Sequence, residues 1–195
     1  MIHSHTELGF INDEIGHGVV ATQFIPAGTI TWVLDKLDRT FTPKQFQKMN
    51  ELYKDILETY SFRNNNGNLV LCWDHGRFVN HSFKSNCIST AYDFEIAIRD
   101  IHPGEQLTDD YGYLNISTPF KAANEGTKRK MVYPDDLVNY YPVWDKKLAE
   151  NFPKIPTVTQ PLAPLLSNKV QKQIDEVLSG KKPLASILEL YYQSK

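Results

Sequence analysis

Short runs of β-branched and aromatic residues, broken by glycine, proline and asparagine, fill the first 113 residues of the chain. Runs of this length and composition are typical of short β-strands joined by tight turns. The segment Asn64–Asn68, Asn-Asn-Asn-Gly-Asn, has the composition of a hairpin turn. The strands that the pattern predicts are two paired strands around the turn 25–28 within residues 16–34, a hairpin of 59–63 with 69–73, a pair of 87–92 with 94–99, and a strand at 106–111.

A single helix is expected inside this strand-rich region. Thr42, Pro43 and Gln45 supply a capping residue, a proline at the first helical position and a glutamine three residues after the cap. Apolar residues then recur at spacings of three and four, which predicts a helix to about Glu58 with one buried face. The residues of this face are Phe46, Met49, Tyr53, Ile56 and Leu57. Because strands do not alternate with helices, the expected fold class is mainly β, with small sheets and one inserted helix.

The pattern changes after Tyr113. Residues 121–130 carry three lysines and one arginine against Glu125 and show no apolar period, which predicts a loop or a disordered segment. Helices are predicted to begin within 134–137, to cover the amphipathic stretch 170–178 closed by a glycine, and to lie within 183–192. The segment 134–195 is therefore expected to form a helical extension with few apolar residues of its own.

Length and composition limit the classes of protein that the chain can belong to. The 195 residues predict one compact domain with an extension, and 41% hydrophobic residues are enough for a packed core. With 21 basic and 23 acidic residues the net charge is −2, so no overall positive field favours binding to nucleic acid or to an anionic membrane. The N-terminus lacks the pattern of a secretory signal, and no apolar run approaches about 18 residues, which predicts a soluble, cytoplasmic protein. The pattern does not define an oligomeric state.

Common site signatures are weak or absent in this sequence. There is no phosphate-binding G-x-x-x-x-G-K-[ST] motif, and Gly16-His17-Gly18 lacks the third glycine of a dinucleotide-binding loop. Cys72 and Cys87 are too few for a four-cysteine zinc site or a disulfide framework. The histidine pairs that could be combined into a metal site are His3 with His5 and His75 with His81. Scattered histidines are more often ordinary polar residues, so no metal is expected.

Three segments together carry the strongest signal. They are GHGVVAT at 16–22 with IPAGT at 25–29, RFVNHSFKSNC at 77–87, and IRDIHPGEQLTDDYG at 98–112. Their order and spacing resemble the SET domain, a family of S-adenosylmethionine-dependent protein lysine methyltransferases. The resemblance covers about residues 7–113, with an insert at about 35–73. Outside this region, residues 114–133 are expected to form a basic loop in place of a cysteine-rich segment, and residues 134–195 are expected to form the helical C-terminal extension.

The resemblance implies a fold of small β-sheets in which the segments around Asn80 and Tyr111 cross in a knot-like arrangement beside the cofactor. It implies further that Tyr111 is the catalytic residue, that it also contacts the cofactor, and that the substrate is a protein or peptide with an accessible lysine. The other residues that the resemblance assigns to S-adenosylmethionine are Gly16, His17, Gly18, Phe78, Asn80 and His81.

Methylation of lysine requires the neutral amine. At neutral pH a lysine with a pKa of about 10.4 lies about 3.4 units from its neutral form, which corresponds to about 4.6 kcal/mol. An apolar channel and the positive charge of the cofactor both lower that pKa, so no dedicated general base is expected. The aromatic residues that are candidate walls of the channel are Tyr60, Phe62, Tyr92 and Tyr113. Each of them is also compatible with an ordinary place in the core.

An acidic stretch precedes and includes the last motif. Residues 93–110 hold six acids against Arg99, which predicts either a surface that attracts a basic peptide or a solvated hairpin face, with Asp109 or Asp110 at the surface. Relatives often bind zinc through cysteines after the tyrosine motif, and residues 120–131 contain none. Closure of the site is therefore expected from the tail, through Tyr140, Tyr141 or Trp144. Phe83 and Ser85 stand where relatives often carry cysteine and proline.

Two other functions are compatible with the same motifs. One is a non-catalytic SET-like module that binds a basic peptide, and the other is a methyltransferase that acts on a small amine. Binding of the cofactor separates the first from an enzyme, and the chemical identity of the methylated product separates the second from a protein methyltransferase.

Overall fold

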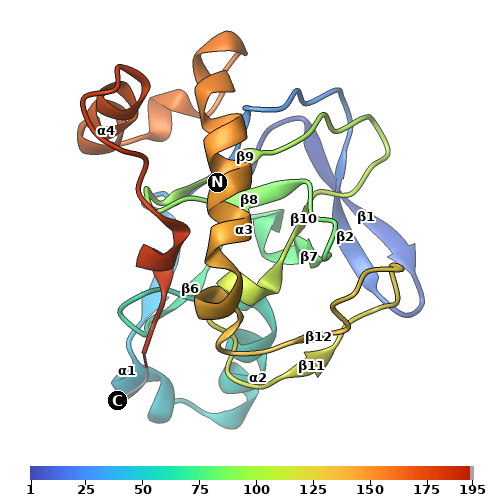
Figure 1. The fold of residues 1–195 in the computed structure, drawn as a ribbon. Helices are drawn as coiled ribbons and strands as arrows, with labels where there is room; N and C mark the ends of the chain where they lie inside the picture. Colours follow the sequence, from blue (N-terminus) through green and yellow to red (C-terminus); the bar gives the residue numbers. More distant parts are fainter. Residues whose placement is uncertain (194–195) are drawn as a thin grey trace.

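The computed structural model describes residues 1–193, which form small β-sheets with helices at their edges (Figure 1). The strands are β1 (Thr6–Asn12), β2 (Gly16–Ala21), β3 (Ile30–Val33), β4 (Arg39–Phe41), β5 (Ser61–Arg63), β6 (Leu69–Leu71), β7 (Asn80–His81), β8 (Cys87–Ser89), β9 (Phe94–Ala97), β10 (Thr108–Asp109), β11 (Phe120–Lys121) and β12 (Met131–Val132). The helices are α1 (Pro43–Gln47), α2 (Glu51–Tyr60), α3 (Asp136–Asn151) and α4 (Asn168–Leu178). None of the helices within residues 1–193 is both long and apolar enough to cross a membrane.

The strands pair in five separate sheets, as expected for a mainly β fold. The antiparallel sheets have the orders β3-β9-β8, β4-β6-β5, β1-β2 and β11-β12, while β7 and β10 form a parallel pair. The predicted hairpins β5-β6 and β8-β9 are confirmed. The predicted pairing of β2 with β3 is wrong, because β2 pairs with β1 and β3 pairs with β9. The turn after β2 thus moves the chain from one sheet to another.

The insert between β4 and β5 contains two helices instead of the predicted single one. Thr42 caps α1 with the expected capping box, but the chain leaves the helix after Gln47 and Asn50 caps α2 anew. The predicted buried face is therefore wrong in part. Leu57 is buried against the β4-β6-β5 sheet, whereas Tyr53 and Ile56 are 64% and 48% exposed. The break at Asn50 rotates the second half of the apolar pattern away from the core.

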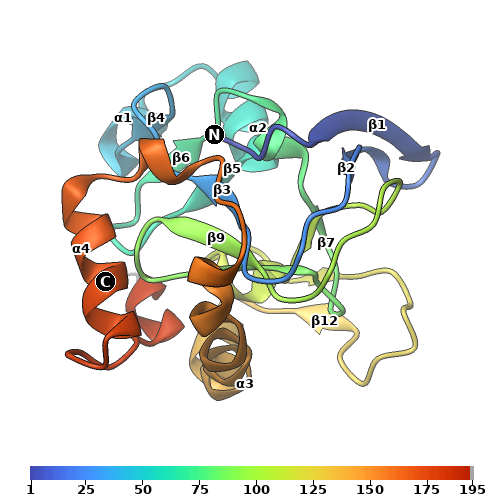
Figure 2. The ribbon, with the colours of Figure 1, turned by 90° about the horizontal axis from the view of Figure 1, so that it is seen from above.

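The C-terminal helices are part of the main core. Trp144 and Leu148 of α3 pack in one cluster with Ile88 of β8 and with Phe94 and Ile96 of β9. Figures 1 and 2 show α3 lying across this sheet, with the insert helices on the other side. The basic segment 121–130 is a loop between β11 and β12, and α4 ends before Gly180 as predicted. The predicted last helix is wrong: only a 3₁₀ turn at Ile187–Leu190 forms there.

We predict that Trp144→Ala lowers the free energy of unfolding of the whole protein by about 3–5 kcal/mol, because it leaves a cavity between α3 and the β8-β9 sheet. Val143→Ala on the same helix, where the side chain is 55% exposed, should change stability by less than about 0.5 kcal/mol. Urea unfolding followed by circular dichroism measures both values. An early transition confined to the C-terminal helices in the Trp144 variant would contradict a shared core.

Candidate functional site

The two central motifs meet at the parallel pair of β7 and β10. Asn80 lies opposite Thr108 and His81 lies opposite Asp109. The amide of Asn86 fastens this crossing, since its Nδ2 donates to the carbonyl oxygen of Gln106 at 2.7 Å and its Oδ1 accepts from the backbone N–H of Thr108 at 2.8 Å. A buried asparagine thus provides the hydrogen bonds that a two-residue pairing cannot supply by itself.

The glycine-rich strand β2 lies against the same crossing. Asn80 Nδ2 donates to the carbonyl oxygen of His17 at 3.0 Å and to Oε1 of Gln106 at 3.1 Å. A Cβ atom on Gly18 would lie 2.6 Å from both side chains, so only glycine permits this close approach. Gly16 has a φ of +78° and open space where a side chain would project. The structure therefore brings Gly16, His17 and Gly18 next to Asn80.

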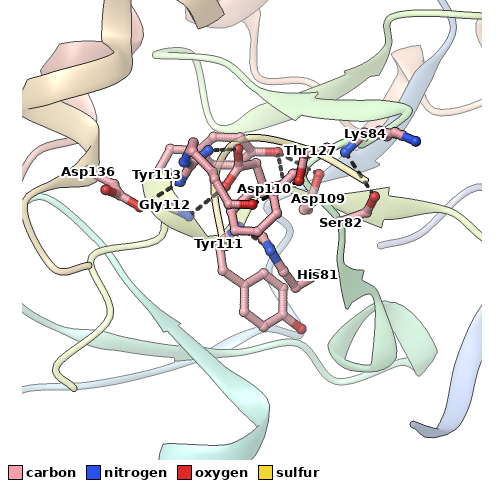
Figure 3. A network of polar contacts seen from close by, with 12 residues as sticks. His81, Ser82, Lys84, Asp109, Asp110, Tyr111, Gly112, Tyr113, Thr127 and Asp136 are labelled. Atoms are coloured by element: carbon pink, nitrogen blue, oxygen red, sulfur yellow. Dashed lines mark hydrogen bonds and ion pairs between the residues drawn. The ribbon is translucent and has the colours of Figure 1, made fainter. Parts of the chain in front are cut away.

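Tyr111 begins the 3₁₀ turn Tyr111–Tyr113 that follows the crossing (Figure 3). Its hydroxyl donates to the carbonyl oxygen of Val79 at 2.6 Å, and its backbone N–H donates to Nδ1 of His81 at 3.1 Å. Burial lowers the pKa of His81, so the neutral ring accepts this bond. Burial also raises the pKa of the Tyr111 phenol, followed by the nearby carboxyls of Asp109 and Glu95. The phenol is therefore protonated across the physiological range.

Tyr111 also forms part of the wall of a cavity of about 430 Å³. Of the predicted channel residues, Tyr60 and Phe62 line this cavity. Tyr92 and Tyr113 do not, and this part of the prediction is corrected. Tyr92 packs against Phe94 and Phe152 in the core, and its hydroxyl accepts the backbone N–H of Ala185. Tyr113 is 1% exposed and donates to Oδ1 of Asp109 at 2.8 Å.

The predicted cofactor residues lie outside the lining of this cavity. The residues Gly16, His17, Gly18, Phe78, Asn80 and His81 are not in its wall. Val79 and Tyr111 join the two regions, because they line the cavity while Asn80 and His81 lie next to them. Phe78 packs against Tyr60 with ring centroids 5.2 Å apart, so it supports the cavity wall from behind.

The acidic stretch 93–110 does not form the predicted continuous acidic surface. Asp109 and Asp110 are each 3% exposed and Glu95 is 9% exposed, so neither of the two aspartates faces solvent. Asp93 and Asp100 remain exposed. A count of charges along the chain could not show that Asp110 is buried against Arg129, while Asp109 is buried beside Tyr113 and Glu95.

Arg129 lies next to Asp110. No motif in the sequence indicated a role for this arginine. Its guanidinium pairs with Asp110 through Nη1 and with Asp136 at 2.5 Å through Nη2. The side chain lies over the rings of Phe83 and Tyr140, each 4.5 Å from the guanidinium carbon. Burial alone lowers the pKa of Arg129, but the two aspartates together raise it above its usual value. The charge therefore persists in a half-buried place.

This ion pair connects the loop 120–132 and α3 to the turn that carries Tyr111. Asp110 accepts the backbone N–H of Gly112 at 3.1 Å and so caps the turn. Gly112 itself leaves room for the contact, because a Cβ there would lie 2.8 Å from Nη2 of Arg129. Trp144 also faces the guanidinium, at 5.7 Å. Tyr140 and Trp144, two of the tail residues expected to close the site, thus hold the loop through Arg129.

A second contact holds the same loop to the β7 segment. Oε1 of Glu125 accepts the hydroxyl of Ser82 at 2.7 Å, and Oε2 accepts the backbone N–H of Phe83 at 2.9 Å. Phe83 in turn packs against the ring of His81, with centroids 4.5 Å apart. Within residues 1–193, no three His, Cys, Asp or Glu side chains come together as metal ligands. In the described part of the chain, ion pairs and aromatic contacts connect the loop to the site.

The fold and the crossing motifs define the class of protein. The SET domain family model matches residues 16–112, which include all three motifs. The chain belongs to the SET domain family. No curated protein sequence matches the chain. One similar solved structure is that of a candidate histone methyltransferase from Plasmodium falciparum, with 17% sequence identity, a TM-score of 0.40, and coverage of 56% of this chain and 95% of that chain.

SET domain methyltransferases as a family use S-adenosylmethionine, and the residues of this chain fit such a ligand in two respects. His81 Nε2 is buried without a hydrogen-bond partner among the described residues, so a polar group is missing at this place. Gly16 leaves open space above its backbone. His81 Nε2 is thus free to bond a polar group of a ligand, and Gly16 leaves room beside β2.

We predict that Arg129→Ala lowers the free energy of unfolding by about 3–5 kcal/mol, because it leaves two buried carboxylates without their cation. Lys128→Ala, which removes an exposed neighbouring charge, should change it by less than about 0.5 kcal/mol. Adding Asp136→Asn to Arg129→Ala should restore part of the loss, since one unpaired charge disappears. Equal effects of the Arg129 and Lys128 variants in urea unfolding would contradict this account.

Proposed function

We propose that this protein is a protein lysine methyltransferase that transfers a methyl group from S-adenosylmethionine to a lysine ε-amine. The observation that carries the proposal is the meeting of three motifs at Asn80, with Tyr111 between that meeting point and the cavity. We assign cofactor binding to Gly16, His17, Gly18, Asn80 and His81, with Phe78 behind them. Tyr60 and Phe62 are proposed as walls of the lysine channel.

The cofactor supplies an activated methyl group on a positively charged sulfur. The chain itself must present a neutral amine to that group. A lysine side chain that enters the cavity leaves water, which disfavours its charged form, while the aromatic faces of Tyr60, Phe62 and Phe120 accept the cation before it loses its proton. The aromatic faces thus favour entry of the charged side chain, and the loss of water favours its later neutralisation.

Tyr111 is proposed to orient this amine. Its hydroxyl hydrogen is already donated to the carbonyl oxygen of Val79, so the phenol oxygen presents its lone pairs to other groups. An amine N–H donated to that oxygen fixes the direction of the nitrogen lone pair. Correct orientation of the reacting atoms is worth several kcal/mol in a displacement reaction. The fixed position of Tyr111 between His81 and Val79 is what gives the orientation its precision.

We predict that Tyr111→Phe lowers turnover by at least about 100-fold while the affinity for S-adenosylmethionine changes by less than about threefold. The assay measures methyllysine by mass spectrometry after incubation of lysate proteins with isotope-labelled cofactor, and calorimetry measures the affinity. Tyr53→Phe, which removes the hydroxyl of a tyrosine that is 64% exposed and lies outside the cavity wall, serves as the matched control. Unchanged turnover would remove Tyr111 from the mechanism, and methylated small amines without methyllysine would replace the proposed substrate class.

We predict that Asn80→Ala weakens binding of S-adenosylmethionine by about tenfold, because it removes the side chain that fixes the His17 backbone and one hydrogen bond of ordinary strength. Asn66→Ala, in the exposed hairpin turn, should leave the affinity unchanged. Calorimetry at constant pH measures both. Wild-type affinity of the Asn80 variant would contradict the assigned role.

A further inference from the structure

Glu95 and Asp109 form a buried pair of carboxyls in the wall of the cavity. Both residues line it, together with Tyr111. Asp109 and Tyr111 are two positions apart along an extended backbone, so their side chains project to the same side, whereas Asp110 between them projects to Arg129. Glu95 reaches the cavity from β9, opposite Trp32 of β3, which also lines it. Two sheets thus place acids beside the proposed catalytic tyrosine.

Neither carboxyl forms an ion pair in the described part of the chain, although the Met1 amine lies near enough to lower the pKa of Glu95. The ion pairs found among residues 1–193 involve other acids. Oδ1 of Asp109 accepts the hydroxyl of Tyr113, and Oε1 of Glu95 accepts that of Ser89 at 3.3 Å. The two carboxyls also form a side-chain hydrogen bond with each other, which opposes ionisation of Glu95 and favours ionisation of Asp109. Trp32 in the same wall is 7% exposed, and its indole N–H is buried without an acceptor.

Unpaired acids in such a place are costly unless they are protonated or meet a cation. Burial raises the pKa of Glu95 well above its usual value, and the neighbouring Asp109 raises it further. Burial likewise raises the pKa of Asp109. Two adjacent buried carboxyls cannot both ionise easily, so the pair retains one proton and carries one negative charge.

We propose that the Glu95–Asp109 pair is the proton acceptor for the target lysine, which replaces the expectation from the sequence that no dedicated base is needed; this inference rests on the proposed function. One N–H bond of the ε-ammonium breaks and its electron pair stays on nitrogen, while the proton forms an O–H bond on the ionised carboxyl. A singly charged pair and an ammonium become a neutral pair and a neutral amine. The proton leaves to solvent through the cavity mouth after the product has departed.

The transfer is feasible because the cavity disfavours both charges. In water the pKa values of lysine and a carboxylic acid differ by about 6 units in the wrong direction. Burial lowers that of the amine and raises that of the acid, each by up to about 3–5 units, so the two together can close the gap. The reaction then exchanges a buried ion pair for two neutral groups, which a site of low dielectric favours.

Other groups around the pair do not supply an alternative acceptor. The titratable and charged groups next to it are the Met1 amine, Cys72 just after β6, Cys87 of β8, Asp110, Tyr111 and Tyr113. Glu58, Arg63 and Arg77 also line the cavity, and Glu58 is exposed to solvent. Burial raises the pKa of both cysteines and both tyrosines above their usual values, so these four remain protonated and cannot accept. Asp110 is already paired with Arg129, and the Met1 amine donates to the Val33 carbonyl oxygen and pairs with Asp35.

The decisive experiment is the pH dependence of methyllysine formation, measured with lysate proteins and labelled S-adenosylmethionine. Asp109→Asn and Glu95→Gln should lower the rate at least about 100-fold near pH 7, where the amine needs an acceptor. The loss should shrink to less than about threefold near pH 10, where solvent hydroxide neutralises the amine. Asp93→Asn is the matched control. This exposed acid lies in the turn between β8 and β9, two residues before Glu95, and its variant should keep the wild-type profile.

The outcomes separate the two proposals. Wild-type protein that forms no methyllysine contradicts the proposed function itself and with it the proton acceptor. An active wild type whose Asp109 and Glu95 variants keep the wild-type pH profile overturns the proton acceptor alone. A rate loss that is equal at every pH also overturns it, because a purely structural role would act at all pH values.

Thermal unfolding gives a second readout that does not depend on activity. A carboxyl whose pKa is raised in the folded state contributes stability at low pH that is lost as the pH rises through the raised value. The melting temperature of Glu95→Gln, measured relative to wild type, should therefore increase between about pH 5 and about pH 8. A difference that stays constant over this range would show that the pair has no raised pKa, and would overturn the proposal.

Discussion

The site depends on one parallel pairing between two strands of two residues each. β7 and β10 come from segments about 28 positions apart, and their pairing alone places Asn80 and Tyr111 in one site. A parallel pair this short has few hydrogen bonds of its own. The Asn86 amide, the contact of Ser82 N–H with the Asp109 carbonyl at 2.8 Å, and the cover of α3 supply the remainder. Removal of that support separates the motifs.

The crossing also buries acidic side chains, and it places them in two different environments. Asp110 pairs with Arg129, whose guanidinium lies over three aromatic rings, and this holds the loop 120–132 against the turn of Tyr111. Asp109 projects into the cavity wall, where Glu95 is its neighbour and neither acid forms an ion pair within residues 1–193. The alternation of an extended backbone thus divides adjacent acids between a structural role and a proposed chemical one.

Local patterns in the sequence were sufficient for the hairpins β5-β6 and β8-β9, the capped start of α1 and the end of α4, because those features depend on neighbouring residues. The family resemblance identified the motifs, and the structure brings Gly16, His17, Asn80 and Tyr111 together. The burial of Asp109, the place of Tyr92 and the role of Arg129 depend on contacts across the whole chain, from β8 to α3. The spacing of residues within a motif does not predict those contacts. The break at Asn50, which divides the predicted helix of the insert in two, was likewise not visible in the local pattern.

The central claim is that residues 16–18, 80–81 and 111 bind one ligand together. Amide hydrogen exchange with and without S-adenosylmethionine tests it most directly, because it reports each segment separately in the same sample. The account predicts that the ligand slows exchange in all three segments at the same concentration. Protection of only one segment, or protection confined to other parts of the chain, would contradict it.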